Sequence, residues 1–506
     1  MTDFITWYLA SSLLGWLTFP ITFRLLPALA DRGYALSRTV GLLLWAWAFW
    51  ILASLGILDN NLGGLLLALL ILVIASLTAL FTQNEIRSTE SATPTSHLAS
   101  LKAWLASHKS LILTTELLFL AAFAFLAFVR ASNPEATGTE KPMELAFING
   151  ILRSPTFPPN DPWLSGWSIS YYHFGYIMTA MLAKFTGTSG NIAFNLMSAL
   201  VFALAALGSY GVLYNLLSAR GSRQADTEQV DTETSTHADS QLASPNSHPA
   251  SRISHPESRI PITNYHLLAL LAPLFLLLIS NLEGLLEIMH GLHIFWPAAN
   301  SQQPIANFWT WLNIKDLNTA PSGTSWLPDR FWWWWRASRV VQDFDLAGAP
   351  LEVIDEFPFF SFLLGDLHPH VLALPFNMLA LGTALNITLG GWRGAINAFG
   401  YRLRALPVDF FFAAIVLGGL AFLNTWDILV SAALIVGAYL LVRIRDDGLS
   451  PARLEDALVL GLPLVAASLS STCPSTSASP RKPAASCPTS SRPRAARICG
   501  SCSGLS

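Results

Sequence analysis

The chain has 506 residues, of which 52% are hydrophobic and only 12% charged, and its net charge is -3. Soluble globular proteins carry about 25% charged residues, so this composition excludes an ordinary soluble enzyme. Without a recurring basic stripe, it also excludes a nucleic-acid-binding protein. Apolar runs near the ~20 residues that cross a bilayer recur along the chain and indicate a multi-pass protein of the cell membrane, with the lipid bilayer as its partner.

Ten clear hydrophobic stretches and one weaker stretch follow one another along the chain. The lipid core offers the backbone no hydrogen-bonding partner, so a stretch that crosses it is expected to be a helix. The weaker stretch, 169–187, contains Tyr171, Tyr172, His173 and Lys184. The sequence predicts an all-α, polytopic transmembrane helix bundle of about 10–11 spans, and the clear stretches lie at about 4–29, 39–58, 62–81, 111–129, 192–216, 266–286, 371–388, 409–423, 428–442 and 457–470.

The arginines of the short loops predict the orientation of the bundle. Three of them follow the first stretch, at positions 24, 32 and 38, whereas the turn at 59–61 has none, so the N-terminus is expected outside. Alternation then places two large loops outside, 130–170 and 287–370. If 169–187 also crossed, every later loop would be reversed, so this segment is expected to be interfacial or re-entrant.

Changes in composition divide the chain into units. Residues 218–262 are polar, rich in Ser, Thr and His, and have almost nothing to bury, so they predict a disordered linker. The expected membrane units are the N-terminal helices 1–110, a first half of the main domain at 111–217, and a second half at 263–469.

The tail 470–506 is of low complexity and contains all four cysteines. It can be interpreted as a disordered Ser/Pro-rich terminus or as a shifted reading frame, which we favour. Residues 470–477 can be encoded as TCC TCT ACC TGC CCT TCT ACC TC, and a move back by one base gives Leu-Leu-Tyr-Leu-Pro-Phe-Tyr-Leu, a natural continuation of the last helix. Sequencing the gene across these codons tests the hypothesis.

The first outward loop contains the candidate catalytic acids Glu135, Glu140, Glu144 and Asp161. Glu140 and Glu144 are four residues apart, so a helical turn places both carboxylates on one face. Such a pair suits a general base and the organisation of a metal or phosphate, whereas the alternative is a pair of solvated loop acids. The prolines around Asp161 restrict the backbone and indicate an ordered loop.

The second outward loop contains eight of the eighteen tryptophans, four of them consecutive. They can form an interfacial aromatic belt. The four consecutive tryptophans, bracketed by arginines, instead favour a binding site, because indoles stack on sugar rings and guanidinium groups bind phosphate. The candidate substrate-binding residues here are Trp332, Trp333, Arg330, Arg336 and Arg339.

Asp366, His368 and His370 form a D-x-H-x-H cluster at the mouth of the span that begins near 371. Ionisable groups are costly in such a place and are usually functional, so the cluster predicts a metal or phosphate site, with a divalent cation as the expected cofactor. Hydrogen-bonded structural polar groups are the alternative. Asp427, at another helix end, is a further candidate for substrate binding, with a cap or a pairing role as its alternative.

Three motifs together carry a family resemblance. Glu-Lys-Pro-Met-Glu at 140–144, Pro-Pro-Asn-Asp-Pro-Trp-Leu-Ser-Gly followed by Tyr171-Tyr172-His173-Phe174-Gly175, and Phe-Phe-Ser-Phe-Leu-Leu-Gly-Asp-Leu-His-Pro-His at 359–370 resemble the YYY-motif integral membrane proteins. This domain family has no known function, and the likeness covers about 110–470. The chain departs from its pattern at the third tyrosine, which is His173. The resemblance marks Tyr171, Tyr172 and His173 as candidate substrate-binding residues.

The layout is in turn similar to that of GT-C glycosyltransferases, which take sugars from polyprenyl-phosphate donors. The first outward loop of that fold carries acidic catalytic residues, and Glu135, Glu140 and Glu144 match them by position. The likeness implies a membrane glycosyltransferase that uses a polyprenyl-phosphate sugar at the outer face. It implies that Glu140 or Glu144 deprotonates the acceptor or coordinates a cation. The alternatives are a non-enzymatic transporter or lipid-handling protein, and an inactive truncated fragment.

Overall fold

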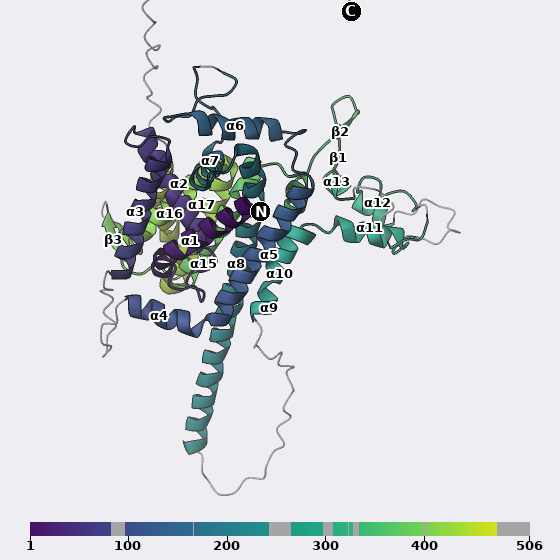
Figure 1. Ribbon diagram of the computed structural model, residues 1–506. Coiled ribbons are helices and arrows are strands. Elements are labelled where there is room, and N and C mark those ends of the chain that lie inside the picture. The colour runs from purple at the N-terminus through teal and green to yellow at the C-terminus, as the bar shows by residue number, and fades with distance from the viewer. Residues whose placement is uncertain are drawn as a thin grey trace, which may run out of the picture.

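The protein is a bundle of helices that spans a membrane several times (Figure 1). The computed structural model describes residues 1–81, 97–164, 166–241, 265–296, 307–321, 323–326, 333–398 and 401–472. Seven helices in these residues are long and apolar enough to cross a bilayer, or eight if one bent pair counts as a span. The seven are α1 (Thr2–Leu25), α2 (Ser37–Ser54), α3 (Leu62–Phe81), α5 (Lys109–Ser132), α8 (Gly190–Gln241, apolar to Gly221), α15 (Pro369–Thr388) and α17 (Thr425–Asp447).

The polytopic helical fold is confirmed, but the predicted count of 10–11 spans is too high. The helix α16 (Pro407–Leu423) has 17 residues and is therefore about 26 Å long, short of the ~30 Å hydrocarbon core. The helix α18 (Ala452–Thr472) has Arg453, Glu455 and Asp456 near its start and is not among the helices apolar enough to span.

The stretch predicted at 266–286 is broken rather than continuous. Its first part is made of α9 (Tyr265–Ala269), α10 (Leu271–Pro273) and the π-helix η1 (Leu274–Ile279). The chain turns at Ser280, whose φ is 55°, and α11 (Glu283–Gly291) leaves at 72° to the preceding helix. Hydropathy over a window does not detect such a break, because both parts are apolar.

The weaker stretch contains α7 (Phe174–Thr186), which does not cross the bundle. Near its start, the ring of Tyr176 lies 5.8 Å from that of Phe147 on α6 (Lys141–Arg153). Near its end, Lys184 donates a hydrogen bond to the carbonyl of Asn60, whose side chain binds the carbonyls of Ile151 and Ser154 at the end of α6. Both ends of α7 therefore lie on the α6 side, and the helix is buried rather than exposed at an interface.

The predicted disordered linker and the predicted frame-shifted tail lie partly outside the described residues. The helix α8 continues through the first part of the predicted linker, to Gln241, and the remainder, within 242–264, is not described. The tail from 473 onward, which contains all four cysteines and most of the proposed frame change, also lies outside the described residues.

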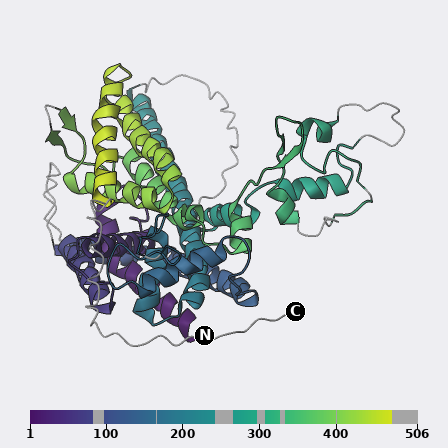
Figure 2. The same cartoon turned by 90° about the horizontal axis from the view of Figure 1, so that it is seen from above.

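The two halves of the chain pack side by side, and α8 lies between α5 and α15 (Figure 2). The described residues between 283 and 357 form a lobe that protrudes beside the bundle and contains α11, α12 (Phe308–Leu312), α13 (Trp333–Ala337) and the antiparallel strands β1 (Gln342–Phe344) and β2 (Pro350–Glu352). The remaining elements are α4 (His97–Ser107), α14 (Pro358–Leu364) and a hairpin of β3 (Ile396–Ala398) and β4 (Tyr401–Leu403).

Candidate functional site

The amphipathic helix α6 lies across one end of the bundle (Figure 1), and one of its acids, Glu144, is buried. Glu140 is the N-cap residue and Pro142 stands in the first turn, where a proline is compatible with the helix. The buried residues recur every three or four positions, so they share one face of the helix. That buried face consists of Lys141, Glu144, Phe147, Ile148 and Ile151.

The second half of the chain meets α6 through the turn between α14 and α15. The helix α14 ends at Gly365, whose φ of 77° is in the left-handed region that favours glycine. Asp366 and Leu367 follow, and His368 is the N-cap of α15, with Pro369 in its first turn. The Leu367 amide donates a hydrogen bond of 2.8 Å to Glu144 Oε2, which connects the two loops directly.

Four side chains from the two loops form what we call the acid–histidine cluster: Glu140, Glu144, Asp366 and His368. His368 lies at its centre, with Nε2 3.3 Å from Glu140 Oε2 and Nδ1 3.2 Å from Glu144 Oε1 and 3.5 Å from Asp366 Oδ2. The Glu144 side chain is fully buried and that of Asp366 is 2% exposed, whereas that of Glu140 is 51% exposed. The cluster thus has a buried floor and one acid that reaches solvent.

Three atoms on the buried floor have no hydrogen-bond partner: Glu144 Oε1, Asp366 Oδ2 and His368 Nδ1. They lie within ion-pair distance of one another, with His368 Nδ1 3.2 Å from Glu144 Oε1 and 3.5 Å from Asp366 Oδ2, but form no well-aligned hydrogen bond. Buried polar atoms are normally satisfied, so this arrangement suits three ligands of one ion. Two ligand atoms that each lie about 2.1 Å from one metal ion are about 3.0–3.4 Å apart, which is close to the separations found here. Glu140, Glu144 and His368 each also offer a donor atom within 4.8 Å of the others, so the residues fit a divalent cation.

The surroundings shift the pKa values of two cluster residues in the same direction. Burial raises the pKa of Asp366 to about 6, against the effect of a hydrogen bond from Thr139. Burial lowers the pKa of His368, but the facing Glu144 carboxylate outweighs this effect and the pKa rises to about 9. Without a metal, His368 is therefore charged at neutral pH and balances the carboxylates around it.

The loop before α6 supports the cluster in a strained conformation. Thr139 has a φ of 49°, which is uncommon for a residue other than glycine and marks functional sites more often than others. Its hydroxyl donates a hydrogen bond of 2.7 Å to Asp366 Oδ1, and Lys141 Nζ lies 3.8 Å from the same oxygen. Both oxygens of Asp366 thus have a defined orientation, one toward Thr139 and the other toward His368.

His370 was predicted to join the metal site but contacts a different acid. Its Nε2 atom is 2.8 Å from Glu356 Oε2, and the Ser361 hydroxyl donates to the same oxygen at 3.1 Å. The hydrogen bond from His370 lowers the pKa of Glu356. The rings of His368 and His370 are 5.6 Å apart, so the predicted D-x-H-x-H set divides into two neighbouring groups.

The sequence matches one family of membrane proteins. Residues 44–479, which include the whole acid–histidine cluster, match the model of the family described as "Uncharacterized membrane protein (DUF2298)". The chain belongs to the DUF2298 family. Neither the comparison with curated proteins nor the comparison with solved structures found a match.

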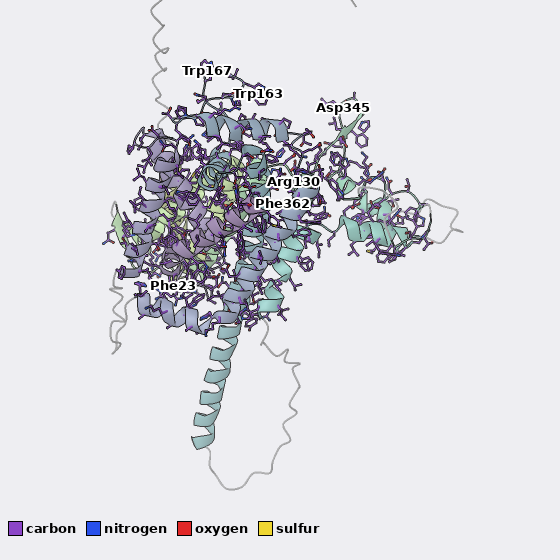
Figure 3. All side chains as sticks on the ribbon, viewed as in Figure 1. Phe23, Arg130, Trp163, Trp167, Asp345 and Phe362 are labelled. Atoms are coloured by element: carbon purple, nitrogen blue, oxygen red, sulfur yellow. The ribbon has the colours of Figure 1, made fainter. Side chains whose placement is uncertain are left out.

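Two of the predicted acids of this DUF2298 protein have local partners outside the cluster. Glu135 is exposed and accepts a long hydrogen bond of 3.4 Å from Thr137. Asp161 accepts hydrogen bonds from the backbone amides of Trp163 and Leu164 and so orders the turn that follows it. The rings of Trp163 and Trp167 are exposed at the tip of this loop, beyond α6 (Figure 3).

The three aromatic residues of the Tyr-Tyr-His motif lie between α6 and α7. The Tyr171 ring stacks on Phe147 of α6, with centroids 5.6 Å apart, and Tyr172 packs on Tyr171 at 5.5 Å. Burial raises the pKa of Tyr171, and the charges of Glu140 and Glu144 raise it further. His173 is the N-cap of α7 and hydrogen-bonds through Nδ1 to the Tyr171 carbonyl. Tyr171 thus packs on α6 within electrostatic reach of two cluster acids, whereas the His173 side chain hydrogen-bonds within the loop that precedes α7.

Two of the predicted cationic groups of the second loop, Arg336 and Arg339, have acidic partners. Arg336 pairs with Asp316 at 2.5 Å on the surface. Arg339 pairs with Glu352 at 2.7 Å and its guanidinium lies 3.7 Å from the centre of the Trp335 ring. Trp334 and Trp335 pack on Phe360 of α14, with centroids 5.8 and 5.7 Å apart.

The other predicted binding residues are placed as follows. Arg330 and Trp332 lie outside the described residues, as does the side chain of Trp333. Asp427 accepts a hydrogen bond of 2.8 Å from Asn377, which is a partner within the bundle. Sequence reasoning missed Thr139 and Lys141, although Lys141 stands inside the Glu-Lys-Pro-Met-Glu motif, and it also missed Arg130 at the end of α5.

Proposed function

We propose that this DUF2298 protein transfers a sugar from a polyprenyl-phosphate donor to an acceptor at the outer face of the membrane, on a bundle of GT-C-like layout. The observation that supports the proposal is the convergence of Glu140 and Glu144 from one loop with Asp366 and His368 from another, around buried atoms that form no aligned hydrogen bond. The cluster lies where a membrane-spanning helix begins, which is where a lipid phosphate meets water.

A divalent cation bound at this site would supply positive charge that stabilises the departing phosphate. Glu144, Asp366 and His368 are the residues that would hold it, because their unpartnered atoms face one another. Glu140 is half exposed and accepts the proton of the acceptor hydroxyl as that oxygen bonds to the anomeric carbon of the sugar. The bond from the anomeric carbon to the phosphate oxygen breaks, and polyprenyl phosphate leaves with the electron pair.

The test is sugar transfer by the full chain reconstituted in lipid vesicles with polyprenyl-phosphate sugars. Loss of a general base typically costs about 10²- to 10⁴-fold in rate, and we expect a loss in this range for Glu140→Gln. Glu144→Gln should also lower the rate, because it removes a carboxylate that would hold the cation. The matched control is Glu455→Gln, because Glu455 is an exposed acid on α18. Wild-type transfer by the Glu140→Gln, Glu144→Gln double variant would refute the assignment.

A second candidate function, transport of a lipid or solute, is favoured by a buried ionic network. Glu116 on α5 pairs with Arg38 on α2 and accepts a hydrogen bond of 2.6 Å from Tyr34. Ionisable residues within spans and interrupted helices, such as the bend at Ser280, are typical of transporters. Flux across vesicles that is lost in Glu116→Gln and kept in Glu140→Gln would favour transport over transfer.

A further inference from the structure

Arg130 is a buried cation beside the acid–histidine cluster with part of its hydrogen-bonding capacity unused. It stands in the last turn of α5 and is only 2% exposed. Nε donates a hydrogen bond of 2.9 Å to Asn195 Oδ1, whereas Nη2 is buried without a partner. A guanidinium has five donors and is costly to bury unsatisfied, so the free donor is an unusual feature that needs a partner. Figure 3 shows Arg130 toward the end of the bundle that α6 covers.

The surrounding backbone holds this guanidinium in one position. A Cβ atom at Gly365 would lie 2.0 Å from Arg130 Nη1, so only glycine leaves room for the side chain here. Asn195, which binds the other side of the group, is itself fixed by hydrogen bonds of 3.0 Å to the carbonyls of Pro134 and Asn191. The guanidinium is therefore held in place in advance, and an anion that binds it would not need to order the arginine first.

Arg130 lies close to the acid–histidine cluster, because its guanidinium packs against Gly365, the residue before Asp366. Asp366 follows Gly365 directly, and Lys141, which is 7% exposed, lies 3.8 Å from Asp366 on the α6 side. Two buried cations thus lie near the acids that suit a divalent metal ion. Phosphate is the common biological anion that binds both a metal ion and the planar fork of an arginine.

We propose that Arg130 binds the phosphate group of a polyprenyl-phosphate lipid. This inference rests on the proposed function and names the residue that holds its donor. Arg130 stands at the end of a spanning helix, at the depth where lipid phosphates lie, so a lipid-borne phosphate fits better than a soluble one. Arg336 and Arg339 form direct ion pairs with Asp316 and Glu352, whereas among the described residues Arg130 forms none and Asp366 acts on it only through space.

The test measures binding of sugar-free polyprenyl phosphate to the full chain in nanodiscs, so that no transfer step is involved. A hydrogen bond to a charged group contributes enough that we expect Arg130→Gln to weaken binding about 10- to 100-fold. Asn195→Ala keeps the charge of Arg130 but removes the hydrogen bond that holds the Arg130 side chain, and we expect this variant to bind polyprenyl phosphate several-fold more weakly. The control is Arg445→Gln, because Arg445 is 55% exposed and pairs with Asp446 at the far end of α17.

Polyprenol and inorganic phosphate serve as the other two probes. Equal affinity of wild type and both variants for polyprenyl phosphate, or equal binding of the neutral polyprenol, would overturn the proposal. Binding of inorganic phosphate without polyprenyl phosphate would overturn the lipid assignment. If Arg130→Gln fails to fold, Asn195→Ala decides. If the protein transfers no sugar but its binding of polyprenyl phosphate depends on Arg130, the proposed enzyme activity is refuted and the lipid site stands. If the protein transfers sugar but its binding of polyprenyl phosphate does not depend on Arg130, the enzyme activity stands and the lipid site is refuted.

Discussion

Replacing Glu144 with Gln should change how the stability of the protein depends on pH. The pKa of His368 is about 9 in the folded protein and about 6.5 when unfolded, mainly because Glu144 faces its Nδ1 atom at 3.2 Å. A raised histidine pKa contributes stability that is complete below pH 6.5 and is lost as the pH rises to 9. One pKa unit corresponds to about 1.4 kcal/mol, and with His368 18% exposed we expect a loss of about 2–3 kcal/mol across this range.

The assay is reversible unfolding in mixed detergent micelles at pH 6.5 and at pH 9.5, with a chelator present to keep the site free of metal. Glutamine keeps the shape and can still accept the hydrogen bond from Leu367, but its amide nitrogen then faces His368 Nδ1, so Glu144→Gln removes both the charge and the acceptor at that position. We expect this variant to lose less than half as much stability over the range, whereas Glu455→Gln should behave as wild type. A wild-type curve that is flat between the two pH values, or one that Glu144→Gln reproduces, would refute the role given to this pair.

The remaining predictions concern metal binding and the buried cations. The affinity of the protein for Mn²⁺, measured by calorimetry, should rise between pH 6.5 and 9, because His368 must lose its proton to bind a metal. Glu144→Gln should weaken the binding of Mn²⁺ about 100-fold. Gly365→Ala should lower the free energy of unfolding by about 1–3 kcal/mol, because its φ is 77° and its Cβ would collide with Arg130; an unchanged melting temperature would contradict this. Glu116→Ala should lower the free energy of unfolding by about 3 kcal/mol, because it leaves Arg38 buried without its ion pair. Tyr34→Phe should lower it by about 1 kcal/mol through the loss of one hydrogen bond, and unfolding in detergent measures both values.

The parts of the site that lie close together in the sequence could be predicted from it. The four-residue spacing of Glu140 and Glu144 predicted one helical turn, and both now stand at the start of α6. The D-x-H-x-H pattern marked Asp366 and His368 because charged groups at the mouth of a span are costly. The distribution of arginines predicted that 169–187 does not cross, and both ends of α7 lie beside α6.

Other features depend on tertiary packing, which local patterns do not contain. Nothing in either loop says that Glu144 meets Leu367, because the contact joins residues 223 positions apart. Nothing in the sequence around Arg130 marks it, because the position of its guanidinium depends on the space that Gly365 leaves. More spans were predicted than the described residues contain because apolar windows show neither the bend at Ser280, nor the short length of α16, nor the charged start of α18.

The contact between Glu144 and the turn at Gly365 also has a consequence for biosynthesis. The first half of the chain is made well before the second, so Glu144 and Arg130 remain without Asp366 and His368 until α15 has been inserted beside α8. Two separately expressed halves, divided within residues 242–264, should therefore recognise each other through this charged junction as well as through apolar packing. Co-purification of the halves should weaken in Glu144→Gln, which would make assembly of the membrane domain a reporter for the same residues that form the site.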